Sequence, residues 1–129
     1  MKTRQLRGVL ITPNKEGTQP REATIEYSGF NDLYKLLDCN MIEIPCYKFG
    51  NSTYDVYCDE EGLLKNGNKP SILAISNMFG QSVVVGSVFI VGRNNRSLTD
   101  KQVAEILGTI QTVRDRYGNK YNVVVSKSV

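Results

Sequence analysis

Residues 81–92, with the sequence QSVVVGSVFIVG, give the strongest strand signal in the chain. The segment is dense in β-branched residues, and its apolar residues do not alternate with polar ones. That pattern is typical of a strand buried on both faces of a sheet. Gly86 interrupts the apolar run and indicates a β-bulge at this point. The sequence therefore predicts one long, buried strand that ends at Gly92.

A polar turn and the start of a helix follow this strand, in residues 93–102 (RNNRSLTDKQ). Thr99 and Gln102 have the spacing of a capping box, in which each side chain binds the backbone of the other residue. Leu98 and Val103 flank this pair as a hydrophobic staple. We therefore expect a well-capped helix to begin directly after Thr99.

Apolar residues continue at helical spacing beyond the cap, which indicates one amphipathic face. These residues are Val103, Ile106, Leu107, Ile110 and Val113. Gly118 is a typical stop after a helix, and residues 121–125 predict a final strand. The pattern thus predicts one long C-terminal helix.

The N-terminal part of the chain predicts a β-hairpin. Residues 7–12 (RGVLIT) form an apolar run, and residues 21–27 (REATIEY) alternate between polar and apolar side chains. The turn-rich residues 13–20 join the two strands. Residues 1–5 are expected to form a flexible tail.

The middle of the chain predicts several short elements. We expect a helix over residues 30–37, strands over residues 41–49 and 54–59, and a loop over residues 60–70. For residues 71–78 the sequence leaves open whether they form a helix or a strand. Asn40 is a plausible left-handed stop for the short helix. Pro45 lacks a backbone N–H, which places its strand at a sheet edge or at a bulge.

These segments together predict an α+β fold in a single domain of residues 1–129. The expected architecture is a largely antiparallel sheet of about five to six strands, with one long C-terminal helix on one face and one or two short helices. The chain has 129 residues, enough for one domain with a sizeable core. No apolar run approaches the ~18 residues of a membrane span and no signal peptide is present, so we expect a cytoplasmic protein.

The composition excludes several chemistries. The sequence contains no histidine, which removes Ser/His/Asp and Cys/His nucleophile activation and most catalytic zinc sites. Its three cysteines form no Cys-x-x-Cys pair and are expected to be reduced and structural. The net charge of +3 favours anionic partners without reaching that of a duplex-binding protein. We therefore expect no metal, no cofactor, no enzymatic activity and no sequence-specific nucleic-acid binding.

The turn before the capped helix is the first candidate ligand site. A helix N-terminus offers free N–H groups and a partial positive charge, and arginine adds paired donors that match phosphate oxygens. The candidate residues are Arg93, Asn94, Asn95, Arg96, Ser97 and Thr99. The alternative is a plain polar turn, because the same composition is common in turns and the cap already uses two of the free donors.

Aromatic residues on the two middle strands form the second candidate. Tyr47, Tyr54 and Tyr57 are suited to stack on a nucleotide base if their rings are exposed. Aromatic residues at this spacing are also typical of cross-strand packing pairs or of an oligomer surface. The sequence does not decide whether these tyrosines lie near the arginine turn.

Four stretches, in order RGVLITP, DEEGLLKNG, GSVFIVG and SLTDKQVAEIL, carry a resemblance to a known family. The chain resembles a family of small phage- and mobile-element-encoded domains of unknown function, over roughly residues 6–110. The resemblance implies an accessory protein that acts in a bacterial cytoplasm. It implies no catalytic residues.

Small proteins from such genomes often counter host defence, and several unrelated families do so by sequestering nucleotide signals. By that analogy the leading hypothesis is a non-enzymatic, anti-defence protein that binds an anionic small molecule, such as a nucleotide. The alternative is a protein–protein inhibitor that docks an edge strand, or the hairpin of the two aromatic middle strands, onto a host defence or regulatory protein.

Overall fold

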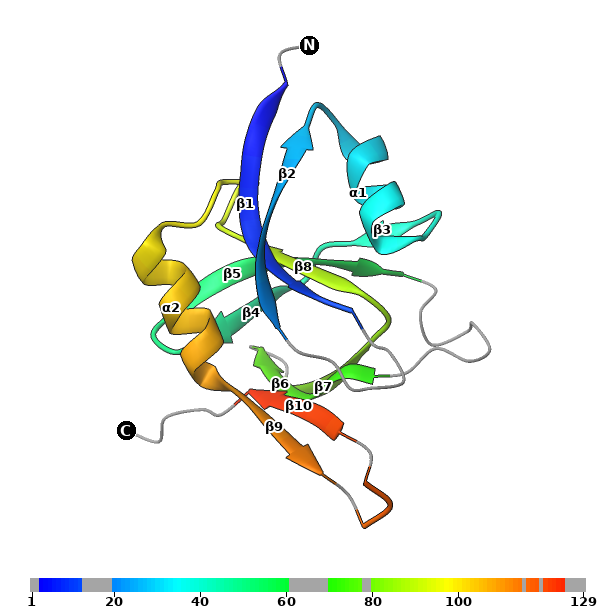
Figure 1. Cartoon of the computed structure of the whole chain (residues 1–129), viewed down its shortest axis with the longest axis vertical. Coiled ribbons are helices and arrows are strands. Elements are labelled where there is room, and N and C mark those ends of the chain that lie inside the picture. Colours follow the sequence, from blue (N-terminus) through cyan, green and yellow to red (C-terminus); the bar gives the residue numbers. More distant parts are fainter. Residues whose placement is uncertain are drawn as a thin grey trace.

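The computed structural model describes residues 3–12, 20–60, 70–77, 80–114, 116–118 and 120–124. Within them the chain forms two helices, α1 (Phe30–Leu37) and α2 (Asp100–Thr109), and two β-sheets (Figure 1). The expected α+β class is therefore confirmed. The turn predicted after Thr12 and the loop predicted over residues 60–70 fall almost entirely outside the described residues.

The larger sheet has six strands, all antiparallel to their neighbours. They are β1 (Arg4–Ile11), β2 (Arg21–Tyr27), β3 (Ile42–Glu43), β4 (Cys46–Phe49), β5 (Ser52–Asp59) and β8 (Val88–Val91). Their order is β2-β1-β8-β5-β3, and β4 pairs with the same edge of β5 as β3 does. The predicted hairpin of β1 and β2 is confirmed. The single strand predicted over residues 41–49 is instead divided around Pro45 into β3 and β4, both of which lie at the edge of the sheet.

Strand β8 lies at the centre of the core because both of its faces are covered. Its four residues are all buried, and their side chains alternate between two clusters on opposite faces of the sheet. Val88 and Ile90 belong to the cluster under α2, and Phe89 and Val91 belong to the cluster under α1. The prediction of a strand buried on both faces is therefore confirmed for Val88–Val91.

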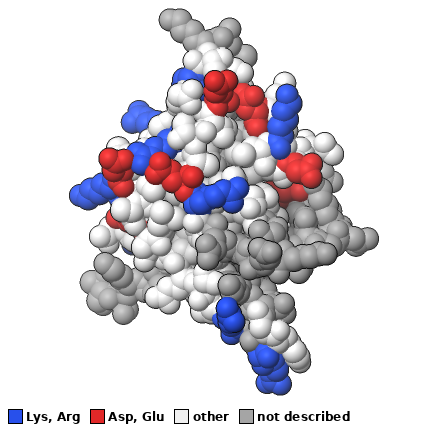
Figure 2. Space-filling view, in the orientation of Figure 1, with Lys and Arg blue, Asp and Glu red and all other residues white. Residues whose placement is uncertain are grey.

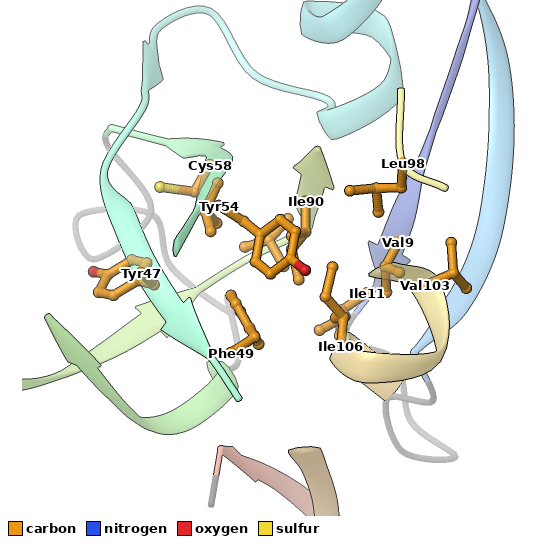
Figure 3. Packing of buried hydrophobic residues seen from close by; sticks show 12 residues of the cluster. Val9, Ile11, Tyr47, Phe49, Tyr54, Cys58, Ile90, Leu98, Val103 and Ile106 are labelled. Atoms are coloured by element: carbon orange, nitrogen blue, oxygen red, sulfur yellow. The ribbon is translucent and has the colours of Figure 1, made fainter. Parts of the chain in front are cut away.

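The cluster under α2 joins that helix to strands β1 and β8 and to the β4–β5 hairpin. It contains Val9, Ile11, Tyr47, Phe49, Tyr54, Val56, Cys58, Val88, Ile90, Leu98, Val103 and Ile106. Figure 3 shows Phe49, Tyr54 and Ile106 pointing toward one another, with the Phe49 and Tyr54 rings 6.0 Å apart in an edge-to-face arrangement. Burial of Leu98 and Val103 in one cluster is what a hydrophobic staple requires.

The predicted continuous strand over residues 81–92 is wrong, because Gly86 ends one strand instead of making a bulge within it. Gly86 has a φ of 84°, and the chain turns there from β7 (Gly80–Val85) into β8. The two strands belong to different sheets. A residue with a side chain rarely adopts this φ, so glycine permits the change of direction.

The predicted long C-terminal helix is also wrong. Helix α2 ends at Thr109, and Ile110 and Val113 lie in strand β9 (Ile110–Arg114). The Thr109–Val113 segment (TIQTV) is rich in β-branched residues, which favour strands over helices. Strand β9 then pairs in antiparallel register with β10 (Lys120–Val124), which supplies the backbone partners that a helix would have supplied internally.

Two further element boundaries differ from the prediction, and the structure decides the type of one segment that the sequence left open. Helix α1 ends earlier than Asn40, with Asp38 in the left-handed conformation as its C-terminal cap. The undecided segment 71–78 is a strand, β6 (Pro70–Asn77), and Met78 falls outside the described residues. Strand β1 begins at Arg4, so Arg4 and Gln5 belong to the sheet and not to an N-terminal tail.

The second sheet has the order β7-β6-β10-β9, with β6 and β10 parallel. Strand β9 pairs with β10 alone, and Figure 1 shows the β9–β10 hairpin projecting from one end of the molecule. Ile110 and Val124 at its base pack against the cluster under α2. Within the described residues, no helix is long and apolar enough to cross a membrane.

Candidate functional site

The predicted arginine turn is a tight reversal between β8 and α2. The backbones of Gly92 and Arg96 bind each other in both directions, with N···O distances of 2.8 and 3.2 Å. Asn94 and Asn95 between them both have positive φ, at 63° and 59°. Asparagine tolerates this conformation better than most residues, which explains the Asn-Asn pair in the sequence.

Strand β1 lies beside this turn and brings a third arginine to it. The Arg4 guanidinium donates hydrogen bonds to the backbone carbonyl and the side-chain oxygen of Asn95. The Asn95 side-chain amide in turn donates to the hydroxyl of Tyr57 on β5. Arg4 also lies over the Tyr27 ring, 5.2 Å from its centroid. The turn is therefore held from two strands.

A fourth arginine, Arg7, links the turn to the start of α2. Its guanidinium pairs with Glu22 at 2.7 Å and with Asp100 at 2.6 Å, and these hydrogen bonds raise the pKa of Arg7 further. The Arg7 backbone N–H donates to the Ser97 hydroxyl, which donates to the Gln5 carbonyl. Ser97 therefore already uses its hydroxyl within the protein.

Asp55 on β5 occupies the other side of the turn. Its carboxylate accepts a hydrogen bond from the Asn94 backbone N–H at 2.9 Å and pairs with the Arg93 guanidinium at 3.1 Å. It also accepts a hydrogen bond from the Cys46 thiol at 3.4 Å. Burial, together with this hydrogen bond, raises the pKa of the Cys46 thiol, so the thiol is protonated at neutral pH and is a poor nucleophile.

The capping box at the start of α2 is confirmed. The Thr99 hydroxyl accepts from the Gln102 backbone N–H, and the Gln102 side chain accepts from the Thr99 backbone N–H. Thr99 thus acts as a cap and its hydroxyl is occupied. Arg96 differs from Arg93, because its exposed side chain forms no hydrogen bond or ion pair with any residue that the structure describes.

Comparison with known protein families matches residues 6–112 to a domain of unknown function named DUF3846. The chain belongs to the DUF3846 family. The match covers β1 through the start of β9 and includes the whole arginine turn. No curated protein and no solved structure shows significant similarity to the chain.

The three tyrosines that were candidates for base stacking lie in the core of the DUF3846 domain. Tyr47, Tyr54 and Tyr57 are 6, 1 and 2% exposed, so their rings offer no free face for a base. Tyr57 lies on the face under α1, where its hydroxyl reaches Asn95, whereas Tyr47 and Tyr54 lie on the opposite face. The structure therefore brings one of the three tyrosines to the arginine turn, through its hydroxyl.

Sequence reasoning missed the contributions of Arg4, Arg7 and Asp55 to this part of the DUF3846 domain. Arg4 lies 91 residues from its partner Asn95 in the sequence, and Arg7 lies 93 residues from its partner Asp100. They meet the turn because β1 pairs with β8. No local pattern in β1 indicates these contacts, because two-residue periodicity only places Arg4 and Arg7 on opposite faces of the strand.

A separate hydrogen bond joins α2 to the β4–β5 hairpin. The Tyr54 hydroxyl donates to the Glu105 carboxylate at 2.8 Å. Burial and this hydrogen bond raise the pKa of Tyr54 to about 12 from an ordinary value of 10.0. The folded state therefore holds the phenol proton more tightly than the unfolded state does.

Replacing Tyr54 with phenylalanine is expected to lower the free energy of unfolding by about 1.5–3 kcal/mol at neutral pH, because a hydrogen bond to a charged group is lost. The contribution of the Tyr54 proton is complete below pH 10.0 and is lost as the pH rises through about 12, since the unfolded state ionises first. Urea unfolding from neutral to alkaline pH should show the difference between wild type and Tyr54→Phe shrinking in that window. A constant difference would contradict this assignment. Burial also raises the pKa of the Cys58 thiol to about 12. This thiol is present in both proteins, so it affects their stability equally.

Proposed function

We propose that this DUF3846 domain is a phage-encoded, non-enzymatic protein that binds a phosphate-bearing small molecule at the arginine turn. A nucleotide signal of host defence is the ligand class we favour, and sequestration in the bacterial cytoplasm is the proposed mode of action. The observation that supports it is the gathering of four arginines around one turn, two from β1 and two from the turn itself.

The charge balance of this region supports an anionic ligand. Two of the four arginines pair with the three carboxylates of this region. Arg7 pairs with Glu22 and Asp100, and Arg93 pairs with Asp55. Figure 2 shows basic and acidic side chains interleaved over this part of the surface. Arg96 supplies the exposed guanidinium, and its paired donors match the oxygens of a phosphate.

Arg93 is the second expected contact. Its side chain is 56% exposed, whereas that of its partner Asp55 is 13% exposed, so a ligand can approach Arg93 from the solvent side. A phosphate at this position would bind Arg93 together with Asp55, and it would be the sole partner of the Arg96 guanidinium among the described groups. Because the nearby tyrosine rings are buried, we expect affinity to depend on the number of phosphates more than on the base.

The state of the thiols supports binding over covalent catalysis. Burial is the main cause of the raised pKa of Cys46 and of Cys58, so both thiols stay protonated at neutral pH. The chain has no histidine to act as a base for either of them. The proposal therefore includes no bond-breaking step.

The test is the thermal stability of the purified protein with a panel of mono-, di-, tri- and cyclic nucleotides. A ligand at about a hundred times its dissociation constant adds ~2.7 kcal/mol, or roughly 5–10 °C in melting temperature for a domain of this size. The double variant Arg93→Gln/Arg96→Gln should lose this shift. The matched variant Lys35→Gln/Lys48→Gln removes the same charge from α1 and β4 and should keep it.

Two results would reject the proposal. One is the absence of any shift across the panel at millimolar nucleotide, and the other is an equal shift in wild type and in Arg93→Gln/Arg96→Gln. A stable complex with a host protein that ignores nucleotides would favour the protein–protein inhibitor instead.

A further inference from the structure

The β9–β10 hairpin combines a buried base with a positively charged tip. Along one face of β9, Ile110 packs against the core and the Thr112 hydroxyl donates to Asn122 at 3.1 Å. Arg114 comes next on the same face, at the tip, because side chains on one face repeat every two residues. Residues 114–120 (RDRYGNK) carry three cationic residues and one acidic residue, Asp115. The hairpin therefore changes from apolar to net cationic as it leaves the body of the protein.

The register of the hairpin places like charges opposite each other. Arg114 is paired with Lys120, and Arg116 lies in the connecting turn. Like charges directly opposite in a two-stranded ribbon destabilise it unless an anion binds between them. The side chains of Arg114 and Arg116 are exposed and form no ion pair with any residue in the described part of the chain.

An exposed aromatic ring accompanies these cations. Tyr117 follows Arg116 in the turn and is 80% exposed, the highest value among the exposed large hydrophobic residues that the structure describes. Figure 2 shows Lys or Arg side chains, and no described carboxylate, on this projecting hairpin in the view given. All the cations of the tip lie beyond residue 112, where the match to the family ends.

We propose that the tip of the β9–β10 hairpin is a binding site for single-stranded nucleic acid. Arg114 and Arg116 would contact phosphates, and Tyr117 would stack on a base. Cations interleaved with an exposed aromatic ring are what sequence-independent recognition of single strands requires, since every base has a face on which a ring can stack. An acidic peptide would satisfy the cations but would make no use of the Tyr117 ring. This site is separate from the arginine turn and does not depend on the function proposed for it.

The test is fluorescence anisotropy with a labelled oligodeoxythymidine of roughly 20 nucleotides, longer than the ~4–16 nucleotides that one small domain covers. We expect wild-type affinity to fall with salt with a log–log slope of about −1.4, as for two phosphate contacts on a single strand. Arg114→Gln/Arg116→Gln should remove most of this slope, and Lys35→Gln/Lys48→Gln should leave it near the wild-type value.

Substitutions of Tyr117 distinguish binding of nucleic acid from binding of an acidic protein. Tyr117→Ala should weaken oligonucleotide binding by about tenfold, and Tyr117→Phe, which keeps the ring, should retain the affinity. Circular dichroism checks that each variant is folded. The proposal is overturned if the two double variants bind alike, if Tyr117→Ala binds as wild type does, or if polyglutamate competes as well as the oligonucleotide. The last two results would together assign the hairpin to an acidic protein.

Discussion

Replacing Gly8 with alanine is expected to lower the free energy of unfolding by about 3 kcal/mol or more, at the upper end of the range for overpacked cores. Gly8 lies in β1, directly beside β8. A Cβ at this position would be 2.5 Å from the Ile90 carbonyl oxygen and 2.8 Å from two atoms of the Phe89 ring. Real Cβ atoms do not approach other atoms so closely, so the two central strands would have to move apart.

The clash at Gly8 is costly because one of its partners is backbone. A side chain can rotate away from a new methyl group, but the Ile90 carbonyl is fixed by the pairing of Val9 with Ile90. Movement of that carbonyl would disturb both clusters, since Val9 and Ile90 contribute to one and Phe89 to the other. We therefore expect a drop in melting temperature of about 10 °C or more.

The matched control is Gly108→Ala in α2. A Cβ at Gly108 would have no heavy atom within 4 Å, and alanine favours a helix over glycine by roughly 1 kcal/mol. Calorimetry and urea unfolding should show a destabilised Gly8→Ala and a Gly108→Ala that is as stable as wild type or more so. Equal effects of the two substitutions would contradict the close approach of β1 and β8.

Replacing Phe89 with alanine should cost about 3–5 kcal/mol, the usual loss for an aromatic residue deleted from a core. Phe89 is fully buried and packs against α1 through the cluster that contains Leu33 and Leu37. Phe30→Ala is the matched control, because Phe30 is 49% exposed on the same helix. Denaturant unfolding should separate the two by at least about 2 kcal/mol, and similar losses would place Phe89 outside the core.

Combining the two substitutions tests how the Gly8 site is built. Loss of the Phe89 ring removes one obstacle to a Cβ at position 8, but the Ile90 carbonyl remains at 2.5 Å. Gly8→Ala/Phe89→Ala should therefore remain less stable than Phe89→Ala. A double variant as stable as Phe89→Ala would mean that the ring alone excludes the methyl group.

The buried strand, the hairpin of β1 and β2, and the capped start of α2 could be predicted because their signals are local. Unbroken apolar residues, two-residue alternation and the spacing of Thr99 and Gln102 each reflect the immediate environment of the segment. The end of α2 could not be predicted in the same way. Ile110 and Val113 fit the helical period, yet pairing with β10 outweighs that fit, and pairing is not visible in the β9 segment itself.

Only the part of the candidate site that is local in the sequence could be predicted. The turn residues are adjacent in the sequence, so they were found together. Arg4 and Arg7 reach the turn only through the pairing of β1 with β8, and Asp55 only through the pairing of β5 with β8. The sequence left open whether the tyrosines are exposed or packed between strands, because a period of two does not say which face of a strand is covered.

The central position of β8 has a consequence for synthesis of the chain. Strands β1 and β5 do not pair with each other, and each uses β8 as its neighbour. A nascent chain that has not yet reached residue 88 therefore holds two unjoined pieces of sheet, each with an open edge where β8 will lie. Open edges invite pairing with other chains, so fragments cut before this strand are expected to form aggregates, and the larger sheet is completed only after β8 has been synthesised.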